Sequence, residues 1–238
     1  QPDFTISDPM LPVLFIHLTN TDGEAYFVSN QSDRPIAFDA NFRIKGKQPE
    51  LWNPLTSEVR LLPEFKQLTG ATSIPMTLAP YESSFIIFRS EAKEEQMAQN
   101  YPEPTLQTEL AGPWTISFQE GRGGPAEPLT TDSLFDWTTS KDPHVKFFSG
   151  TATYKTTFKM KKLPETPLYI DLGKVMVMAR VRINGQEVGG VWTSPYRLNI
   201  SQAVRKGLNE LEIEVVNCWR NRLIGEKKLP ENERFTFQ

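Results

Sequence analysis

The chain has 238 residues, 38% of them hydrophobic, and its 26 Lys and Arg against 29 Asp and Glu give a net charge of −3. No apolar run approaches the roughly 18 residues of a membrane span, which argues against a membrane-spanning helix. No basic cluster is large enough to bind the phosphates of a nucleic acid, which argues against nucleic acid as a partner. The single cysteine, Cys218, excludes an internal disulfide, and we expect it to be small and partly buried. The chain begins at Gln1 without a signal-peptide pattern, and we expect it to be a piece of a longer protein.

Residues 1–90 contain seven strand-like runs separated by turn residues, at spacings of about 8–12 residues. The run at 37–44 alternates from Phe38 onward, with three polar residues on one face and four apolar residues on the other: Phe38, Ala40, Phe42 and Ile44. Such half-buried strands predict an antiparallel β-sandwich, which we define as an accessory domain over residues 1–90.

Residues 91–105 lose the apolar pattern, gain charge and end in two prolines, which is typical of a solvated linker. Strand patterns return in residues 106–238, after a polar, Gly- and Pro-rich stretch at 120–143 that is too long for a simple hairpin turn. Asn184-Gly185 between alternating runs predicts a tight hairpin. Ser201–Gly207 predicts one helical turn, with Ser201 as its N-cap.

The last predicted strand, around NELEIEVVNCW, alternates glutamates with apolar residues. Extending its period-2 pattern places Asn217 and Trp219 on the inward side with Leu211, Ile213 and Val215. Trp219 is therefore interpreted either as a core or interdomain packing residue or as a sugar-stacking platform.

Catalytic and metal-binding patterns are weak. His17 and His144 lie in different predicted domains, and we expect each to be satisfied or exposed. Glycoside hydrolysis needs two carboxyl groups about 5–10 Å apart, and no pair stands out among acids such as Asp39, Asp136 and Asp171. Asp171 is expected to bond at a strand end. We expect no catalytic residue, no metal ligand and no cofactor in this chain, with structural Ca²⁺ left open.

Aromatic residues of the second half offer a different chemistry, because sugar C–H faces stack on rings while Asn and Arg bond hydroxyls. The same aromatics could equally fill the core of their own sandwich. The candidates for carbohydrate binding or interdomain contact are Trp192, Tyr196, Asn217, Trp219, Asn221 and Arg222.

The stretch 169–226 resembles the sugar-binding jelly roll of family 2 glycoside hydrolases. It has an Asp-Leu-Gly strand, Asn-Gly-x-x-x-Gly from Asn184, a Pro-aromatic step at Pro195 and Gly-x-Asn-x-Leu-x-Ile-x-Val-x-Asn from Gly207. With FFSGTATYKTTF, NRLIGE and YFVSNQSDRPIAFDANFRIKGKQPELWNPLTSEVR, residues 14–238 resemble the C-terminal region of bacterial α-L-rhamnosidases of glycoside hydrolase family 106. The chain departs from the family pattern at Cys218, Arg220 and Glu226, which weakens a ligand role there.

The resemblance implies an all-β chain of two β-sandwich domains, the second a galactose-binding-like jelly roll, at 1–90 and 106–238 with a linker at 91–105. It implies non-catalytic modules of a periplasmic or extracellular polysaccharide-degrading enzyme, partnered by a catalytic barrel of the same polypeptide and by carbohydrate. Two alternatives stay open: an autonomous carbohydrate-binding module using Trp192, Tyr196 and residues 217–222, and a cell-surface adhesion or assembly module. For Arg222 we favour bonds within its own module over an outward reach.

Overall fold

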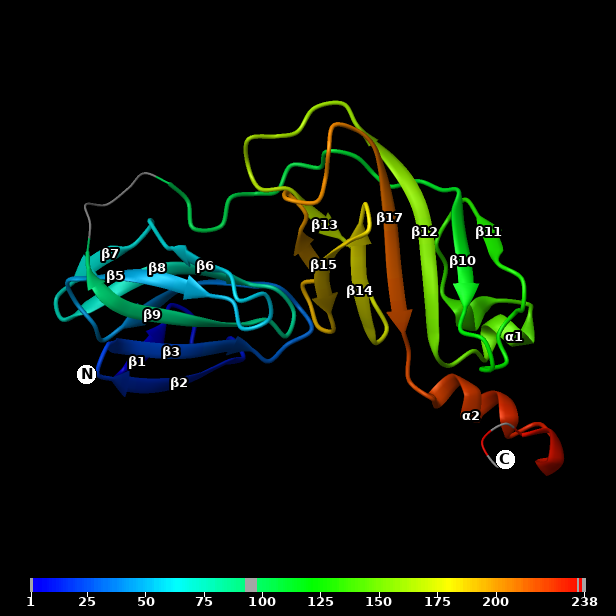
Figure 1. Ribbon diagram of the computed structural model, residues 1–238. Coiled ribbons are helices and arrows are strands. Elements are labelled where there is room, and N and C mark those ends of the chain that lie inside the picture. The colour runs from blue at the N-terminus through cyan, green and yellow to red at the C-terminus, as the bar shows by residue number, and fades with distance from the viewer. Residues whose placement is uncertain (1, 93–97, 235, 237–238) are drawn as a thin grey trace. The chain divides into compact units, whose positions relative to one another are not determined.

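The computed structural model describes residues 2–92, 98–234 and 236. Strands make up most of the regular secondary structure, and the chain divides into two compact units (Figure 1). Unit 1 comprises residues 1–105 with 193–195, and unit 2 comprises 106–192 with 196–238. The predicted domains at 1–90 and 106–238 stay a prediction, and residues 93–97 of the predicted linker lie outside the described residues.

Unit 1 is a sandwich of two antiparallel sheets. The first sheet has five strands in the order β2 (Val13–Asn20), β3 (Gly23–Asn30), β9 (Ser83–Glu91), β5 (Lys47–Trp52) and β6 (Val59–Leu61). The second has the order β1 (Phe4–Ile6), β4 (Ile36–Phe42), β8 (Ala71–Leu78) and β7 (Lys66–Leu68). The predicted antiparallel sandwich is confirmed.

The core of unit 1 forms where the inner faces of these two sheets meet. The alternation predicted for β4 is confirmed, because Phe38, Ala40 and Phe42 are buried in that core. The Phe42 ring lies 4.9 Å from the ring of Tyr26 and 5.3 Å from that of Phe88, both on strands of the opposite sheet. Burying each such side chain stabilises the fold by about 1.5–3 kcal/mol.

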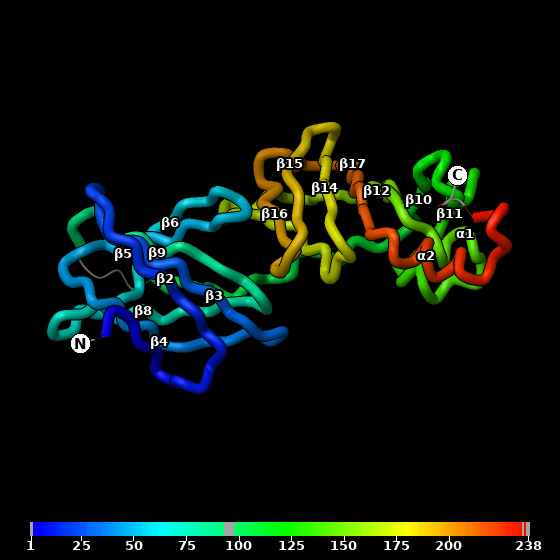
Figure 2. The backbone as a smooth tube through the Cα atoms, turned by 90° about the horizontal axis from the view of Figure 1, so that it is seen from below, coloured from blue at the N-terminus to red at the C-terminus, as the bar shows by residue number. Residues whose placement is uncertain are grey.

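Unit 2 is the second β-sandwich. Its larger sheet has six strands in the order β11 (Leu129–Thr131), β10 (Trp114–Phe118), β12 (Thr151–Met160), β17 (Gly207–Val216), β14 (Met178–Ile183) and β15 (Gln186–Val191). Figure 2 shows β14 and β15 side by side at one edge of this sheet. A two-stranded sheet of β13 (Tyr169–Asp171) and β16 (Arg197–Asn199) contributes Ile170 and Leu198 to the same core.

Two of the five tryptophans fill the core of unit 2. Trp114 and Trp137 are buried, and Trp137 Nε1 donates a hydrogen bond to Tyr154 Oη at 2.5 Å. Burial raises the pKa of Tyr154 to about 12, against the opposing effect of this bond. Core packing, the alternative interpretation of the aromatics, therefore holds for these two residues.

Short helices and turns complete unit 2: η1 (Trp137–Thr139), α1 (Pro143–Lys146), α2 (Arg220–Glu226) and η2 (Glu231–Glu233). The polar stretch at 120–143 thus contains η1, β11 and the start of α1. The longest of the described helices, α2, has 7 residues, so none of them could cross a bilayer.

The Asn184-Gly185 hairpin is confirmed, with φ of 53° and 80° at the two turn residues. The turn predicted at Ser201–Gly207 is present but shorter, because the Ala203 and Val204 N–H groups both donate to the Ile200 carbonyl, at 3.0 and 3.1 Å. Residues 201–203 form a hydrogen-bonded turn, and Gly207 opens β17. Ser201 is not an N-cap there, because its backbone N–H and its hydroxyl both donate to Asn199 Oδ1, at 3.0 and 2.7 Å.

Candidate functional site

The end of β17 meets the loop that precedes β12, and Asn217 joins them. Its Nδ2 donates to the Phe148 carbonyl at 2.9 Å, and its Oδ1 accepts from the Gly150 N–H at 2.9 Å. Both polar ends of this amide are therefore engaged by backbone. Asn217 holds the loop rather than presenting a free amide to a ligand.

Arg222 lies on the first turn of α2, with its side chain largely buried within unit 2. The guanidinium donates to the Arg122 carbonyl and lies 3.7 Å from Glu226, measured from Nε to Oε1. Gly123 has a φ of 67°, which favours glycine, and a Cβ added there would lie 2.5 Å from Arg222 Nη2 and would displace the guanidinium. Arg222 bonds within its own unit, as we favoured, and it fastens residues 122–123.

The backbone of α2 is fixed at the same point. The Arg222 N–H donates to Ser149 Oγ at 3.0 Å, and that hydroxyl donates to the Cys218 carbonyl at 3.0 Å. Cys218 itself is exposed, so its predicted partial burial is wrong. Asn221 is half-buried beside Arg222.

Trp219 does not lie on the inward side, so that prediction is wrong. Strand β17 ends at Val216, and Trp219 is the N-cap of α2, where the period-2 alternation no longer applies. Its side chain is 45% exposed, and the Arg122 guanidinium lies 5.4 Å from the centre of its ring. Of its two predicted roles, core packing is excluded, while interdomain contact and sugar stacking stay predictions.

Trp192 lies at the same end of the six-stranded sheet. It follows Val191, which pairs with Ala179 of β14, and Ala179 pairs in turn with Val215 of β17. Trp192 is 54% exposed, whereas Tyr196 is half-buried against the core of unit 2. The sheet register therefore brings Trp192 and residues 217–222 to one end of the sheet, although they are far apart in sequence.

Exposed apolar residues that the sequence analysis did not select lie on the elements that carry or adjoin these candidates. Three precede or open β14 at the same sheet end, and two lie on α2: Met176, Val177, Met178, Leu223 and Ile224. The sequence carries one signal for three of these residues. Residues 175–178 are all apolar, whereas a strand with one face in water alternates apolar and polar residues. With Trp192 and Trp219 they form what we call the sheet-end surface.

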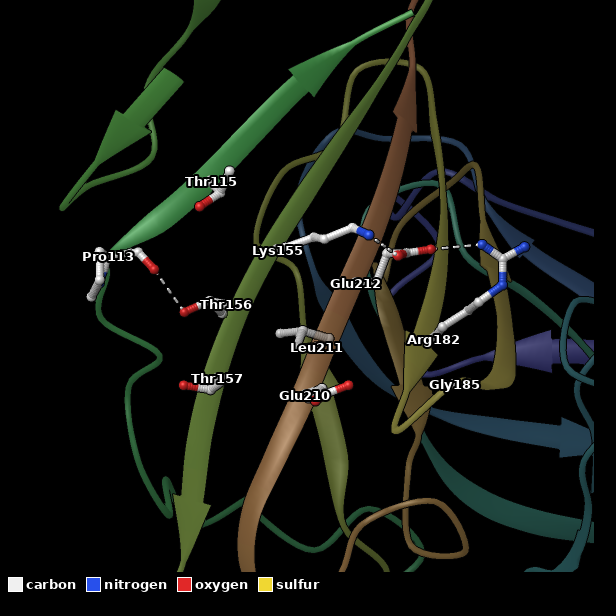
Figure 3. Close-up of a pocket in the computed structure, with 10 residues that line it drawn as sticks. All are labelled: Pro113, Thr115, Lys155, Thr156, Thr157, Arg182, Gly185, Glu210, Leu211 and Glu212. Carbon is white, nitrogen blue, oxygen red and sulfur yellow. Dashed lines mark hydrogen bonds and ion pairs between the residues drawn. The ribbon is translucent and has the colours of Figure 1, made fainter. Parts of the chain in front are cut away.

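An open pocket of about 440 Å³ lies on the outer face of the same sheet (Figure 3). Glu212 lines this pocket between two cations: Lys155 Nζ lies 2.9 Å from its Oε2, and Arg182 Nη1 donates to its Oε1 at 2.8 Å. The hydrogen bonds from Lys155 and Arg182 lower the pKa of Glu212. The threonine hydroxyls of Thr115 and Thr157 complete a polar lining.

These pocket residues were not among the predicted site residues. Lys155, Arg182 and Glu212 occupy polar positions of alternating strands, so their outward orientation could be predicted. Which of them meet is set by the pairing of β12, β17 and β14. The described pocket lining contains no aromatic ring, so a sugar bound there would be held by hydrogen bonds alone.

The predictions for His17, His144 and Asp171 are confirmed. His17 Nε2 is 2.9 Å from Glu24 Oε2, and His144 is exposed with Nδ1 3.2 Å from the Gly123 carbonyl. Asp171 accepts at the end of β13 from the Gly173 N–H and from Arg197, at 2.8 and 2.7 Å. Within the described ranges, no three His, Cys, Asp or Glu side chains are grouped so as to hold a metal ion.

Two family models match the chain. One described as alpha-L-rhamnosidase matches residues 1–67, and one described as glycosyl hydrolase 2 galactose-binding domain-like matches residues 131–236. A putative beta-glucuronidase from Formosa agariphila is 40% identical over 140 residues, covering 56% of this chain and 11% of that protein. The match to a galactose-binding-like domain covers most of unit 2, and it agrees with the β-sandwich seen there.

The structure of a rhamnosidase from Novosphingobium sp. PP1Y matches with a TM-score of 0.89 and 38% identity, over 96% of this chain and 22% of that one. The resemblance to α-L-rhamnosidases and to the family 2 galactose-binding-like domain is confirmed. The chain spans about a fifth of that rhamnosidase and about a tenth of the Formosa protein.

Proposed function

We propose, on the premise that the chain resembles α-L-rhamnosidases over nearly its whole length, that it forms two non-catalytic β-sandwich modules of a secreted glycoside hydrolase. The enzyme would act on plant or microbial polysaccharide in the periplasm or outside the cell. One observation carries this proposal: the rhamnosidase match takes in 96% of this chain but only 22% of that protein. The catalytic barrel and its acids would lie in other parts of the same polypeptide.

The carboxyl groups with shifted pKa values support a non-catalytic role. A general acid in glycoside hydrolysis needs a raised pKa. Hydrogen bonds from Lys155 and Arg182 instead lower the pKa of Glu212, and hydrogen bonds from Thr138 lower that of Asp136. For Glu50, burial acts to raise the pKa, but hydrogen bonds from Arg89 and Trp52 outweigh it and lower the value.

The sheet-end surface is the part of unit 2 suited to contact with the catalytic domain or its sugar. Asn217 and Arg222 brace the loops behind it, while Trp192 and Trp219 present ring surface outward. Rigidly held, exposed aromatic rings are enriched where proteins bind partners and sugars.

Activity measurements on the full-length polypeptide and on the 238-residue chain test the proposal. We expect the full-length polypeptide to hydrolyse an aryl α-L-rhamnoside and the isolated chain to leave it intact. Hydrolysis by the isolated chain, or a full-length product with no glycosidase domain and no activity, would overturn it.

An autonomous carbohydrate-binding module is the second candidate, favoured by the exposed Trp192 and by Trp219 with Arg122 over its ring. Calorimetry on the isolated chain with rhamnose-containing oligosaccharides separates the two. Binding at millimolar or tighter affinity that Trp192→Ala abolishes, with circular dichroism unchanged, would support autonomous binding. Binding kept by that variant would place the sugar elsewhere.

A further inference from the structure

The five-stranded sheet of unit 1 has a second apolar face, on the side away from the core. Cross-strand pairing brings one residue from each strand into a single row: Ile16, Phe27, Phe85, Trp52 and Val59. Directly paired residues point to the same side of an antiparallel sheet. Their in-chain neighbours Tyr26, Ile86 and Leu51 are buried in the core, so this row faces outward.

The next row of the same face is also mostly apolar. It consists of Leu18, Ala25, Ile87, Glu50 and Leu61 in register, and Leu14 extends the face along β2. Ile16 is 58% exposed and Leu14 62%. We call these two rows with Leu14 the apolar outer face.

Glu50 is the charged residue of these two rows, and its carboxylate is paired with donors from Arg89 and Trp52. Arg89 Nε donates to its Oε1 at 2.9 Å, and Trp52 Nε1 donates to its Oε2 at 3.0 Å. The Arg89 guanidinium also lies 5.2 Å from the centre of the Trp52 ring. The carboxylate therefore does not interrupt the apolar surface with an unpaired charge.

A sheet with one face in water alternates apolar and polar residues, whereas a sheet covered on both sides is apolar throughout. Along the two rows described above, the five-stranded sheet follows the second pattern. An apolar sheet face of this kind packs against helices or a further sheet, and the largest exposed apolar patch of a protein, typically about 300–600 Å², is often functional.

We propose that the apolar outer face docks onto the catalytic domain of the same polypeptide, packing against apolar side chains of the helices on its surface. The inference rests on the proposed function and names the surface by which unit 1 supports that domain. The α-L-rhamnosidase family model matches residues 1–67, which hold four of the five strands of this face. The face is therefore largely part of what the chain shares with those longer enzymes.

The size of the face favours a tethered partner over a second copy of the chain. Five strands about 4.8 Å apart, each contributing about 14–17 Å of length, give a footprint of roughly 300–400 Å². Stable complexes of free proteins bury about 800 Å² per partner. A domain on the same polypeptide needs less, because the tether supplies a high effective concentration.

Hydroxyl-radical footprinting of the full-length polypeptide and of the 238-residue chain tests the proposal. We expect oxidation of Ile16, Trp52 and Phe85 to fall roughly tenfold in the full-length polypeptide, as for residues at the dry centre of an interface. Leu68, exposed on β7 of the other sheet, should oxidise equally in both. Equal oxidation of the outer face in both proteins would overturn the docking surface.

Charge insertion provides a second test in the full-length polypeptide. Ile16→Glu and, at the far edge, Val59→Glu should each restore oxidation of Phe85, whereas Leu68→Glu should not. Loss of protection with all three variants, or with none, contradicts the proposal. Two variants at opposite edges guard against one that fails to fold.

Two further outcomes separate this proposal from its alternatives. Light scattering that finds the isolated chain dimeric, with the face already protected, would assign the face to a second copy and overturn the proposal. Rhamnosidase activity of the full-length polypeptide is scored independently, so an active enzyme with an unprotected face refutes the docking surface while leaving the proposed function standing.

Discussion

The outer faces of the two large sheets differ in kind. On the six-stranded sheet of unit 2, Arg182 bonds Glu212 and Glu214 at 2.8 and 3.1 Å, and Lys155 pairs with Glu212, so the face carries compensating charges. On the five-stranded sheet of unit 1, a row of apolar side chains crosses all five strands. Charged residues keep a face in water, and apolar residues favour its burial. The two units therefore share the sandwich architecture but differ in the outer face of the larger sheet, which is charged in unit 2 and apolar in unit 1.

The largest expected effect contrasts the two faces of one strand. Phe88 is buried on the inner side of β9 and Phe85 is half-buried on its outer side. We expect Phe88→Ala to lower the free energy of unfolding by about 3–5 kcal/mol because it leaves a cavity. Phe85→Ala should cost about 1 kcal/mol or less in the isolated chain. Urea unfolding measures both, and similar costs would contradict the assignment of the two faces.

A smaller effect is expected at the sheet end of unit 2. Asn217→Ala leaves the Gly150 N–H and the Phe148 carbonyl without their partner and should cost about 1–3 kcal/mol. Trp192→Ala, its exposed neighbour at the same sheet end, should change stability by less than about 0.5 kcal/mol. If Asn217→Ala leaves the thermal stability unchanged, Asn217 would again be a candidate for binding a ligand.

The charged outer face of unit 2 predicts a pH dependence of stability at Glu212. Because hydrogen bonds from Lys155 and Arg182 lower the pKa of Glu212, its ionised form contributes stability above the ordinary value of 4.5, and this contribution is lost as pH falls through the lowered value. Glu212→Gln should cost about 0.5–1 kcal/mol at pH 7, allowing for solvent screening. In urea unfolding the difference from wild type should shrink as pH falls below 4.5, and a difference that stays constant with pH would argue against the ion pairs.

The smallest stability effect is expected on the apolar outer face. Ile16→Thr keeps a β-branched side chain on β2 and should change the free energy of unfolding by about 0.5 kcal/mol or less. It should nevertheless reduce binding of an apolar fluorescent dye to the isolated chain. Thr157→Ser on the charged face is the matched control, and an equal reduction in both variants would place the dye elsewhere.

Predictions from the sequence were most accurate for features that depend on a few consecutive residues. The alternation at 37–44, the Asn184-Gly185 hairpin and the bonding role of Asp171 each depend on a few consecutive residues, and all three agree with the structure. The prediction for Trp219 was wrong, because the alternation was extended past Val216 into a segment that forms α2. A helix turns about 100° per residue, so a strand pattern carries no information across that junction.

The candidate site was predicted only in part, because its assembly depends on residues that are far apart in the sequence. Trp192 and residues 217–222 were selected for their chemistry, but their meeting at one sheet end, together with Met176–Met178, depends on how β15, β14 and β17 pair. The pocket around Glu212 and the apolar outer face were missed. In VLFIHLT almost every residue is apolar, so no alternation marks which side of β2 meets the core.

The sequence by itself determined the class of this protein, its two runs of strands, its principal turns and its resemblance to α-L-rhamnosidases. Only the tertiary structure decided which apolar faces are covered, which charges meet and which aromatic rings remain exposed. The physical reason is that strand periodicity reports which residues share a face, while the cover of that face depends on cross-strand register and on sheets formed by residues far apart in the chain.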